Sequence, residues 1–294
     1  GARAQNAIIP MNLLNKSRVC DYVVTGYWSQ KTAIEAAKYG IVNIASSTEG
    51  DFISIPPPSS WRIKNTTSYV HICSNETVHG VEFSKFPDLN SINRGHIPLI
   101  VDISSNILNR PMDFSNVGLA YASAQKNVGA AGLTIVIINE SLLTDKKDRG
   151  LIICPSVFDY RNILKNNSMY NTPPTYSIYI AGLMFDWLIK KGGIEVIEQI
   201  NIKKSQLIYD ALDLSDFYQT PVQAPFRSKV NIPFFLPEDD LNDIFIEGAK
   251  KRGLLNLKGH PVLGGLRASI YNSMPIEGVQ SLVSWLKEFE NKYG

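Results

Sequence analysis

The sequence predicts an α/β protein with a mostly parallel central sheet in a large domain and a smaller α+β domain at the carboxyl end. Through the first two-thirds of the 294 residues, short apolar runs alternate with helical patterns, which is the rhythm of βαβ units. Beyond that point the chain is first helical and then mixes strands with helices. We expect the large domain to span residues 1–192 and the small domain residues 193–294, because Gly192 and Gly193 interrupt the pattern.

The elements of the large domain follow from local patterns. A strand at 21–25 precedes a helix at 29–39, with Ser29 as the expected N-cap and Gly40 as the stop. Short apolar runs predict further strands at 41–45, 68–73, 97–102, 118–122 and 133–138. Since parallel strands share one carboxyl edge, we expect residues with chemistry on the loops that leave that edge.

The rest of the chain predicts two long helices followed by mixed elements. The helices are expected at 177–191 and 194–212. We expect strands at 228–235, 254–257 and 266–271, and helices at 239–251 and 275–293. The last helix carries an apolar stripe at helical spacing, which predicts a core face rather than a partner surface: Val279, Leu282, Val283, Leu286 and Phe289.

The composition is that of an ordinary globular protein, with 44% hydrophobic residues, 19% charged residues and a net charge of +2. It gives no argument for nucleic acid or an anionic membrane as partner, and no apolar run reaches membrane-spanning length. Three cysteines without metal-ligand spacing (Cys20, Cys73 and Cys154) predict small buried hydrophobes, free thiols in a reducing compartment such as the cytoplasm, and no metal site. The chain starts at Gly1 without methionine, as a processed product or a piece of a longer protein would.

Lys126 and Asp102 are the residues that point most directly to chemistry. Lys126 is the one cation between the apolar runs 117–124 and 133–138, and Asp102 ends the apolar run 97–102 as its single charge. A buried lysine is costly unless its pKa falls or it is covalently bonded. A pyridine aldehyde cofactor uses such a pair, with the amine forming a Schiff base and the carboxylate keeping the ring nitrogen protonated. A buried ion pair or a loop lysine would give the same pattern.

Other candidates lie on predicted loops. Trp28 follows the first strand and could stack on a flat ring, or be an ordinary core or surface aromatic. Thr77 lies in a polar cluster after a strand, where it could donate to a ligand or simply form a turn. Asn171 and Thr172 precede two prolines and a helix, where they could face an anion or only form a helix-start turn.

A glycine-rich apolar segment at 259–272 carries two further polar candidates, His260 and Arg267. An arginine within a strand-like run suits a bidentate carboxylate clamp, and a structural salt bridge explains it equally well. The other histidines, which have no partner at metal-ligand spacing, are expected to be structural or loop residues: His71, His79 and His96.

Segments along the whole chain together resemble phosphoserine aminotransferases, a family of fold-type I pyridoxal-phosphate enzymes of serine biosynthesis. The motif Tyr-Ala-Ser-Ala-Gln-Lys-Asn-Val-Gly, which contains Lys126, is one of the similar segments. In the family's order, the similar segments are residues 1–5, 21–29, 74–83, 104–113, 121–129, 168–175 and 257–275. The resemblance implies a fold-type I transferase with pyridoxal 5'-phosphate as cofactor.

The resemblance also implies how the chain holds the cofactor ring. Lys126 would form the Schiff base, Asp102 would pair with the pyridine nitrogen, and Trp28 would stack on the ring. Thr77 would bind near the phenolic oxygen.

For the cofactor phosphate, the resemblance implies a site shared by the two subunits of a homodimer. Ala2, Arg3 and Gln125 would hold the phosphate within one subunit. Asn171 and Thr172 would reach it from the partner subunit.

The implied reaction transfers an amino group from glutamate to 3-phosphohydroxypyruvate, giving O-phosphoserine, with Lys126 as the general base. A related keto acid of pyridoxine biosynthesis is a second implied substrate. Arg267 would clamp the substrate α-carboxylate and His260 would lie near its phosphate. The family has an arginine after this histidine where this chain has Pro261, and it has a longer amino-terminal part with a Ser-His-Arg segment. We therefore expect a depleted distal-anion site and little transaminase activity for the chain in this extent.

Two alternatives stay open from the sequence. One is a lyase or desulfurase on the same fold, although no glycine-flanked cysteine resembles a persulfide carrier. The other is a truncated subunit that binds the cofactor without activity.

Overall fold

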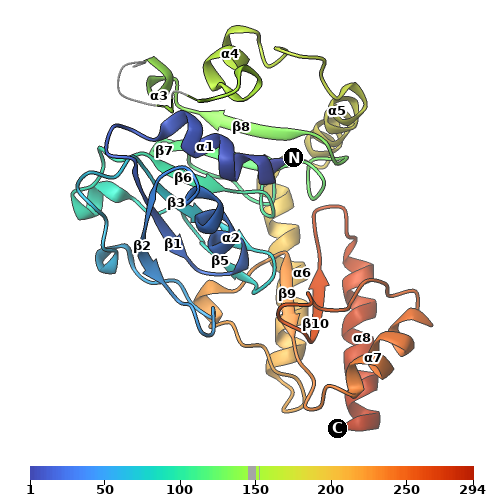
Figure 1. Ribbon diagram of the computed structural model, residues 1–294. Coiled ribbons are helices and arrows are strands. Elements are labelled where there is room, and N and C mark those ends of the chain that lie inside the picture. Colours follow the sequence, from blue (N-terminus) through green and yellow to red (C-terminus); the bar gives the residue numbers. More distant parts are fainter. Residues whose placement is uncertain (145–149, 152) are drawn as a thin grey trace.

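The computed structural model describes residues 1–144, 150–151 and 153–294, and its largest feature is a sheet in the order β2-β1-β3-β6-β7-β8 (Figure 1). Its strands are β1 (Val19–Val24), β2 (Ile41–Ser47), β3 (Val70–Cys73), β6 (Leu99–Asp102), β7 (Val117–Ser123) and β8 (Thr134–Ile138). Neighbouring strands pair in parallel, except that β8 pairs antiparallel with β7. A small hairpin of β4 (Asn75–Glu76) and β5 (Val81–Glu82) follows β3.

The helices of the large lobe lie along the sheet and beyond its β8 edge (Figure 1). They are α1 (Gln5–Leu13), α2 (Tyr27–Ala36), α3 (Ser141–Thr144), α4 (Tyr160–Lys165) and α5 (Thr175–Lys190). α1 and α2 pack on one face, where they meet the side chains of Tyr22, Ile100 and Tyr121 in one buried cluster. One member of this cluster, Ala2, also lines the cavity of the candidate active site.

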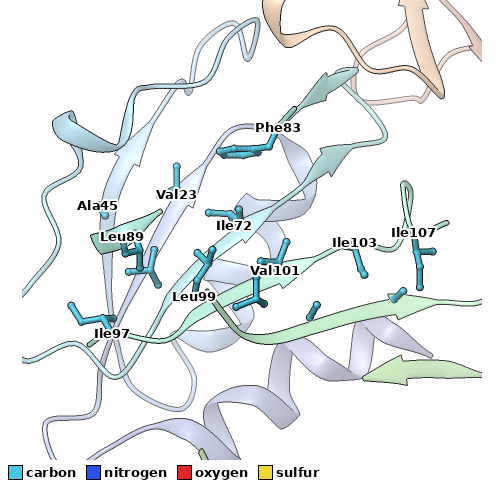
Figure 2. Packing of buried hydrophobic residues seen from close by; sticks show 14 of the residues in the cluster. Val23, Ala45, Ile72, Phe83, Leu89, Ile97, Leu99, Val101, Ile103 and Ile107 are labelled. Carbon is cyan, nitrogen blue, oxygen red and sulfur yellow. The ribbon is translucent and has the colours of Figure 1, made fainter. Parts of the chain in front are cut away.

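The opposite face of the sheet carries a second buried cluster, whose Val23, Ile72, Leu99 and Val101 are shown in Figure 2. Most of its cover comes from segments outside the α-helices: Trp61, Phe83 and Ile107 lie on connecting segments, Leu89 begins a short 3₁₀ helix, and Ala181 of α5 adds to them. The sheet is therefore covered on both faces, although the cover on this face is largely irregular chain.

A separate lobe contains β9 (Asn231–Phe234) and β10 (Leu266–Ser269), which pair antiparallel, together with α7 (Leu241–Lys250) and α8 (Ile276–Tyr293). The long α6 (Ile194–Asp213) runs beside this small sheet (Figure 1). The buried hydrophobic residues of this lobe form one cluster, whose members lie between Ile208 and Phe289 in the sequence. The predicted stripe on α8 lies in it, with Val283 partly exposed, so the prediction of a core face is confirmed. The boundary at Gly192 and Gly193 stays a prediction.

Three local predictions were wrong. The helix expected from Ser29 begins at Tyr27, because Ser29 lies in the first turn and hydrogen bonds back to the Gly26 amide at 3.2 Å. Residues 254–257 form no strand, since only an isolated bridge joins Lys258 to Leu266. Cys154 is partly exposed, unlike the fully buried Cys20 and Cys73, although all three are free thiols. No helix in the described part of the chain combines the length and apolar character that crossing a membrane requires.

Candidate active site

A cavity of 240 Å³ opens at the carboxyl edge of the large sheet. The chain brings together here residues that are far apart in sequence, because β1, β3, β6 and β7 are parallel and end at the same edge. The lining residues are Ala2, Arg3, Asn6, Trp28, Thr32, Cys73, Asn75, Thr77, Asp102, Ser104, Ser105, Ser123, Gln125 and Lys126. Eight of the predicted site residues are therefore in one place: Ala2, Arg3, Trp28, Thr77, Asp102, Gln125 and Lys126 line the cavity, and Arg267 borders it through Thr77.

Asp102 forms the end of β6, and its carboxyl group faces the cavity. The Ser104 amide donates to its Oδ1 at 2.8 Å. Burial raises the pKa of Asp102, while the hydrogen bonds from Ser104 and the Lys126 ammonium oppose this shift. The carboxyl group is thus held by hydrogen bonds at the end of a buried strand, where it can pair with a cationic group of a ligand.

Lys126 lies in the turn that follows β7, and its side chain enters the same cavity. Its Nζ donates to the hydroxyl Oγ1 of Thr77 at 2.7 Å. Burial lowers the pKa of Lys126, while the Asp102 carboxylate opposes the shift and the Arg267 guanidinium adds to it. A lowered pKa increases the fraction of neutral amine, which is the form that attacks an aldehyde.

Trp28 lines the cavity from the first turn of α2, and Glu76 holds that turn in place. Glu76 is fully buried, and its carboxyl oxygens accept the backbone N–H groups of Trp28 and Ser29, each at 2.9 Å. A Cβ on Gly26 would lie 2.5 Å from Cγ and Cδ of Glu76, so glycine is required for this close approach. The indole is therefore fixed by a residue 48 positions away in the sequence.

The amino-terminal helical segment also lines the cavity, through Ala2, Arg3 and Asn6. Ala2 and Arg3 belong to a short 3₁₀ turn that runs into α1, and the Ala2 amide donates to Ser123 Oγ at 3.2 Å. A helix amino terminus has unpaired N–H groups and a positive dipole end, which favour an anion. Together with the Arg3 guanidinium and serine hydroxyls, this side of the cavity suits a phosphate group.

Arg267 and His260 come from the small lobe and contact Thr77, which lines the cavity, and Tyr27, which is next to Trp28 in sequence. Nη1 of Arg267, on β10, donates to the Thr77 carbonyl at 3.2 Å. The His260 ring is 5.2 Å from the Tyr27 ring. Burial first, and then the Arg267 guanidinium, lower the pKa of His260. Both residues are thus available to anionic groups of a ligand that projects out of the cavity.

Asn171 and Thr172 are not brought into this cavity. Both are exposed on the segment that precedes α5, and neither lines the pocket. Their predicted role from a partner subunit remains a prediction.

The sequence analysis missed several residues of the site, and the most informative of them is Glu76, which does not line the cavity but supports Trp28. It stands in the polar cluster 74–79, where only Thr77 was singled out. A single charge directly after the buried strand β3 was a usable signal, since such a charge needs partners. The remaining missed residues are Asn6, Thr32, Cys73, Asn75, Ser104, Ser105 and Ser123.

The donor set fits pyridoxal phosphate. Lys126 supplies an amine for its aldehyde, Asp102 a carboxylate for its ring nitrogen, and Trp28 a flat indole for its ring. The helix amino terminus with Arg3 suits its phosphate. Among the described residues, no group of three or more histidines, cysteines or acids could hold a metal ion.

Comparison with known proteins supports this interpretation. The family model for class-V aminotransferases matches residues 1–282. The phosphoserine aminotransferase of Burkholderia ambifaria is 51% identical over 294 residues, which is 99% of this chain and 79% of the relative. Among solved structures, the phosphoserine aminotransferase of Bacillus circulans subsp. alkalophilus has a TM-score of 0.94 at 40% identity, covering 100% of this chain and 80% of that one. The pyridoxal-phosphate-bound enzyme of Trichomonas vaginalis has a TM-score of 0.91 at 37% identity, covering 98% and 80%.

Proposed function

Because this chain belongs to the phosphoserine aminotransferases within the class-V aminotransferase family, we propose that it transfers the amino group of glutamate to 3-phosphohydroxypyruvate. The product is O-phosphoserine, and pyridoxal phosphate is the cofactor. The observation that supports this most is the meeting of Lys126, Asp102 and Trp28 in one cavity, from three separate elements of the fold. Family membership disfavours the lyase and desulfurase alternative.

Three residues of the cavity would have separate roles in this reaction. When bound, pyridoxal phosphate supplies an aldehyde that bonds amines and a ring that accepts electrons. Lys126 would bond the aldehyde through Nζ and, when displaced by a substrate amine, carry a proton as general base. Asp102 would hold a proton on the ring nitrogen, and Trp28 would orient the ring by stacking.

For the anionic groups, we propose that Ala2, Arg3 and Gln125 bind the cofactor phosphate. Arg267 would bind the substrate α-carboxylate and His260 would lie near its distal anion. Pro261 is exposed beside His260 and has no side-chain donor, so it adds no cation there. These assignments rest on the placement of the residues around the mouth of the cavity.

Borohydride reduction followed by peptide mapping tests the cofactor assignment. We expect the pyridoxyl group on Lys126, and Lys126→Ala should lose both the label and turnover. Lys204 is the internal control, because it is also buried with a pKa lowered to about 8, yet its Nζ donates to the Tyr271 carbonyl at 2.9 Å outside the cavity. A label on Lys204 instead of Lys126 would contradict the proposed function.

We further propose a homodimer in which Asn171 and Thr172 complete the phosphate site of the partner subunit. Apolar side chains next to this loop support a covered surface: Tyr176 is 71% exposed, Tyr179 62% and Ile189 72%, all on α5. These residues follow the loop in sequence, so a single subunit interface could bury them and also bring the loop next to the cavity of a second subunit.

Mixing two inactive variants tests the shared site. Lys126→Ala chains mixed with chains carrying Thr172→Arg should regain part of the activity, because hybrid dimers contain one intact site. Pairing Lys126→Ala with Asp102→Asn is the matched control, since both residues belong to the same subunit's cavity and hybrids gain nothing beyond the parents. An active protein that stays monomeric would refute the shared site.

Two organisational proposals accompany this function. We propose that the two domains meet at Gly192 and Gly193, which have φ values of 103° and 87° between α5 and α6. We also propose a reducing compartment, the cytoplasm, in keeping with three free cysteines.

A further inference from the structure

His71 is a buried titratable residue that the proposed reaction does not use. It lies on β3, it is fully buried, and its ring stacks on Tyr22 with ring centroids 4.9 Å apart. Burial lowers the pKa of His71 to about 3, so the ring is neutral at physiological pH. Within the described residues its Nδ1 has no hydrogen-bond partner, and its Nε2 is 3.0 Å from the hydroxyl of Tyr121. A buried imidazole with a single partner calls for an explanation.

Tyr121 connects this histidine to the site. It is fully buried on β7, where it is the register partner of Asp102 on β6, so both side chains lie on the same face of the sheet. Its hydroxyl is within hydrogen-bond reach of the Asp102 carboxyl group and of the Thr32 hydroxyl. Thr32 already donates its proton to the Trp28 carbonyl at 2.9 Å.

The protons in this chain of groups can be placed by elimination. Tyr121 has one hydroxyl proton, and a carboxylate is a stronger acceptor than either the Thr32 hydroxyl oxygen or a neutral imidazole nitrogen, so we assign the proton to Asp102. The tyrosine oxygen then accepts from His71, whose proton must lie on Nε2. Ser104 N–H donates to Oδ1 of the same carboxylate at 2.8 Å. Both interactions lower the pKa of Asp102, which lines the cavity, and so favour its ionised form.

We propose that His71 and Tyr121 are positioning residues, which orient the Asp102 carboxylate and keep it ionised for the ring nitrogen of the cofactor. This inference rests on the proposed function. The chain runs from His71 Nε2–H to the Tyr121 hydroxyl and on to the Asp102 carboxylate, across three neighbouring parallel strands. No proton is transferred along it during the reaction; its hydrogen bonds stabilise the charged form of Asp102.

A double-mutant cycle on cofactor affinity tests the proposal. Tyr121→Phe keeps the buried ring and removes the hydroxyl, and should raise the dissociation constant of pyridoxal phosphate about tenfold, as expected for one lost hydrogen bond to a charged group. In an Asp102→Asn background the same change should cost less than about twofold, because Tyr121 acts through that carboxylate. Tyr22→Phe is the matched control, since its hydroxyl contacts Tyr69 at 3.1 Å and not Asp102, and it should change affinity less than about twofold.

The cycle separates the two ways to fail. If Tyr121→Phe lowered the affinity for pyridoxal phosphate tenfold both in the parent chain and in the Asp102→Asn background, Tyr121 would have only a structural role and the inference would be overturned. An unchanged affinity in Tyr121→Phe would overturn it as well. If the unsubstituted chain bound no pyridoxal phosphate, the proposed function would fail and this inference with it.

A second measurement needs no folded Tyr121 variant and no cofactor. ¹⁵N NMR of the histidine-labelled protein, which has four histidines, reports the protonation of each ring nitrogen. We expect a neutral His71 with its proton on Nε2, assigned through the signal missing from His71→Gln. A proton on Nδ1 would reverse the direction of the Tyr121 hydrogen bond and overturn the proposal.

Discussion

Replacing Glu76 by glutamine tests how the fold holds Trp28 over the cavity. The carboxyl oxygens of Glu76 face three donors at the start of α2: the backbone N–H groups of Trp28 and Ser29 at 2.9 Å each, and the Ser29 hydroxyl at 2.6 Å. Glutamine keeps the length of the side chain but replaces one oxygen by an NH₂ group, which has no lone pair to accept with. At least one buried donor of α2 must then face another donor.

The structure sets the size of the expected effect. Glu76 is fully buried, so solvent does not replace the lost partner. One hydrogen bond to a charged group contributes on the order of 1.5–3 kcal/mol, and loss of a negative charge at a helix amino terminus adds about 0.3–1 kcal/mol. We therefore expect Glu76→Gln to lower the free energy of unfolding by about 2–4 kcal/mol.

Urea denaturation, followed by circular dichroism, measures this change. Glu49→Gln is the matched control, because Glu49 accepts one exposed hydrogen bond from the Gln30 side chain of the same helix, at 2.8 Å. Such a surface change should alter stability by less than about 0.5 kcal/mol. If Glu76→Gln also stayed within about 0.5 kcal/mol of the parent chain, the carboxylate would not be the cap that fixes α2, and the argument for Trp28 positioning would fall.

Three further changes have defined outcomes. Gly26→Ala should lower the free energy of unfolding by roughly 1–3 kcal/mol in thermal or urea unfolding, because its Cβ would lie 2.5 Å from the hydrogen-bonded Glu76 side chain. The control is Gly182→Ala on α5, whose Cβ meets nothing within 4 Å and which should stabilise the helix by roughly 1 kcal/mol. Arg267→Lys should raise the KM for glutamate roughly tenfold or more in steady-state assays, with a smaller change in kcat, because an ammonium group cannot bind a carboxylate in the bidentate manner. An unchanged KM would show that Arg267 does not belong to the substrate site. Burial lowers the pKa of His71 from 6.5 to about 3, so the unfolded chain binds more protons than the folded chain between those pH values. The contribution of this residue to stability is therefore complete above pH 6.5. It is lost as the pH falls, by up to about 1.4 kcal/mol per pH unit. Burial also lowers the pKa of His79, to about 4, so its contribution has the same sign. Unfolding free energies measured from pH 7 to pH 4 should show the combined slope, and His71→Gln should reduce it; equal slopes in the two proteins would contradict the assignment.

Local pattern was sufficient for most of the elements and for the centre of the site. The apolar runs that predicted strands correspond to β1, β2, β3, β6, β7 and β8. The central strands β3, β6 and β7 are almost entirely buried, which requires apolar residues, whereas the edge strands β2 and β8 are partly exposed. Lys126 and Asp102 could be identified for the same reason, since a lone charge at the end of a buried run must have a partner or a function. The resemblance of whole segments then supplied the cofactor.

What the sequence alone could not determine depends on contacts between distant residues. The antiparallel direction of β8 depends on how a connection turns, and the early start of α2 depends on Glu76, which is remote from that helix in sequence. The chain from His71 through Tyr121 to Asp102 exists only because β3, β6 and β7 lie side by side in register. Composition and periodicity record which residues are buried, whereas the direction of a strand, the cap of a helix and the partner of a buried polar atom are decided by geometry that forms only when the chain has folded.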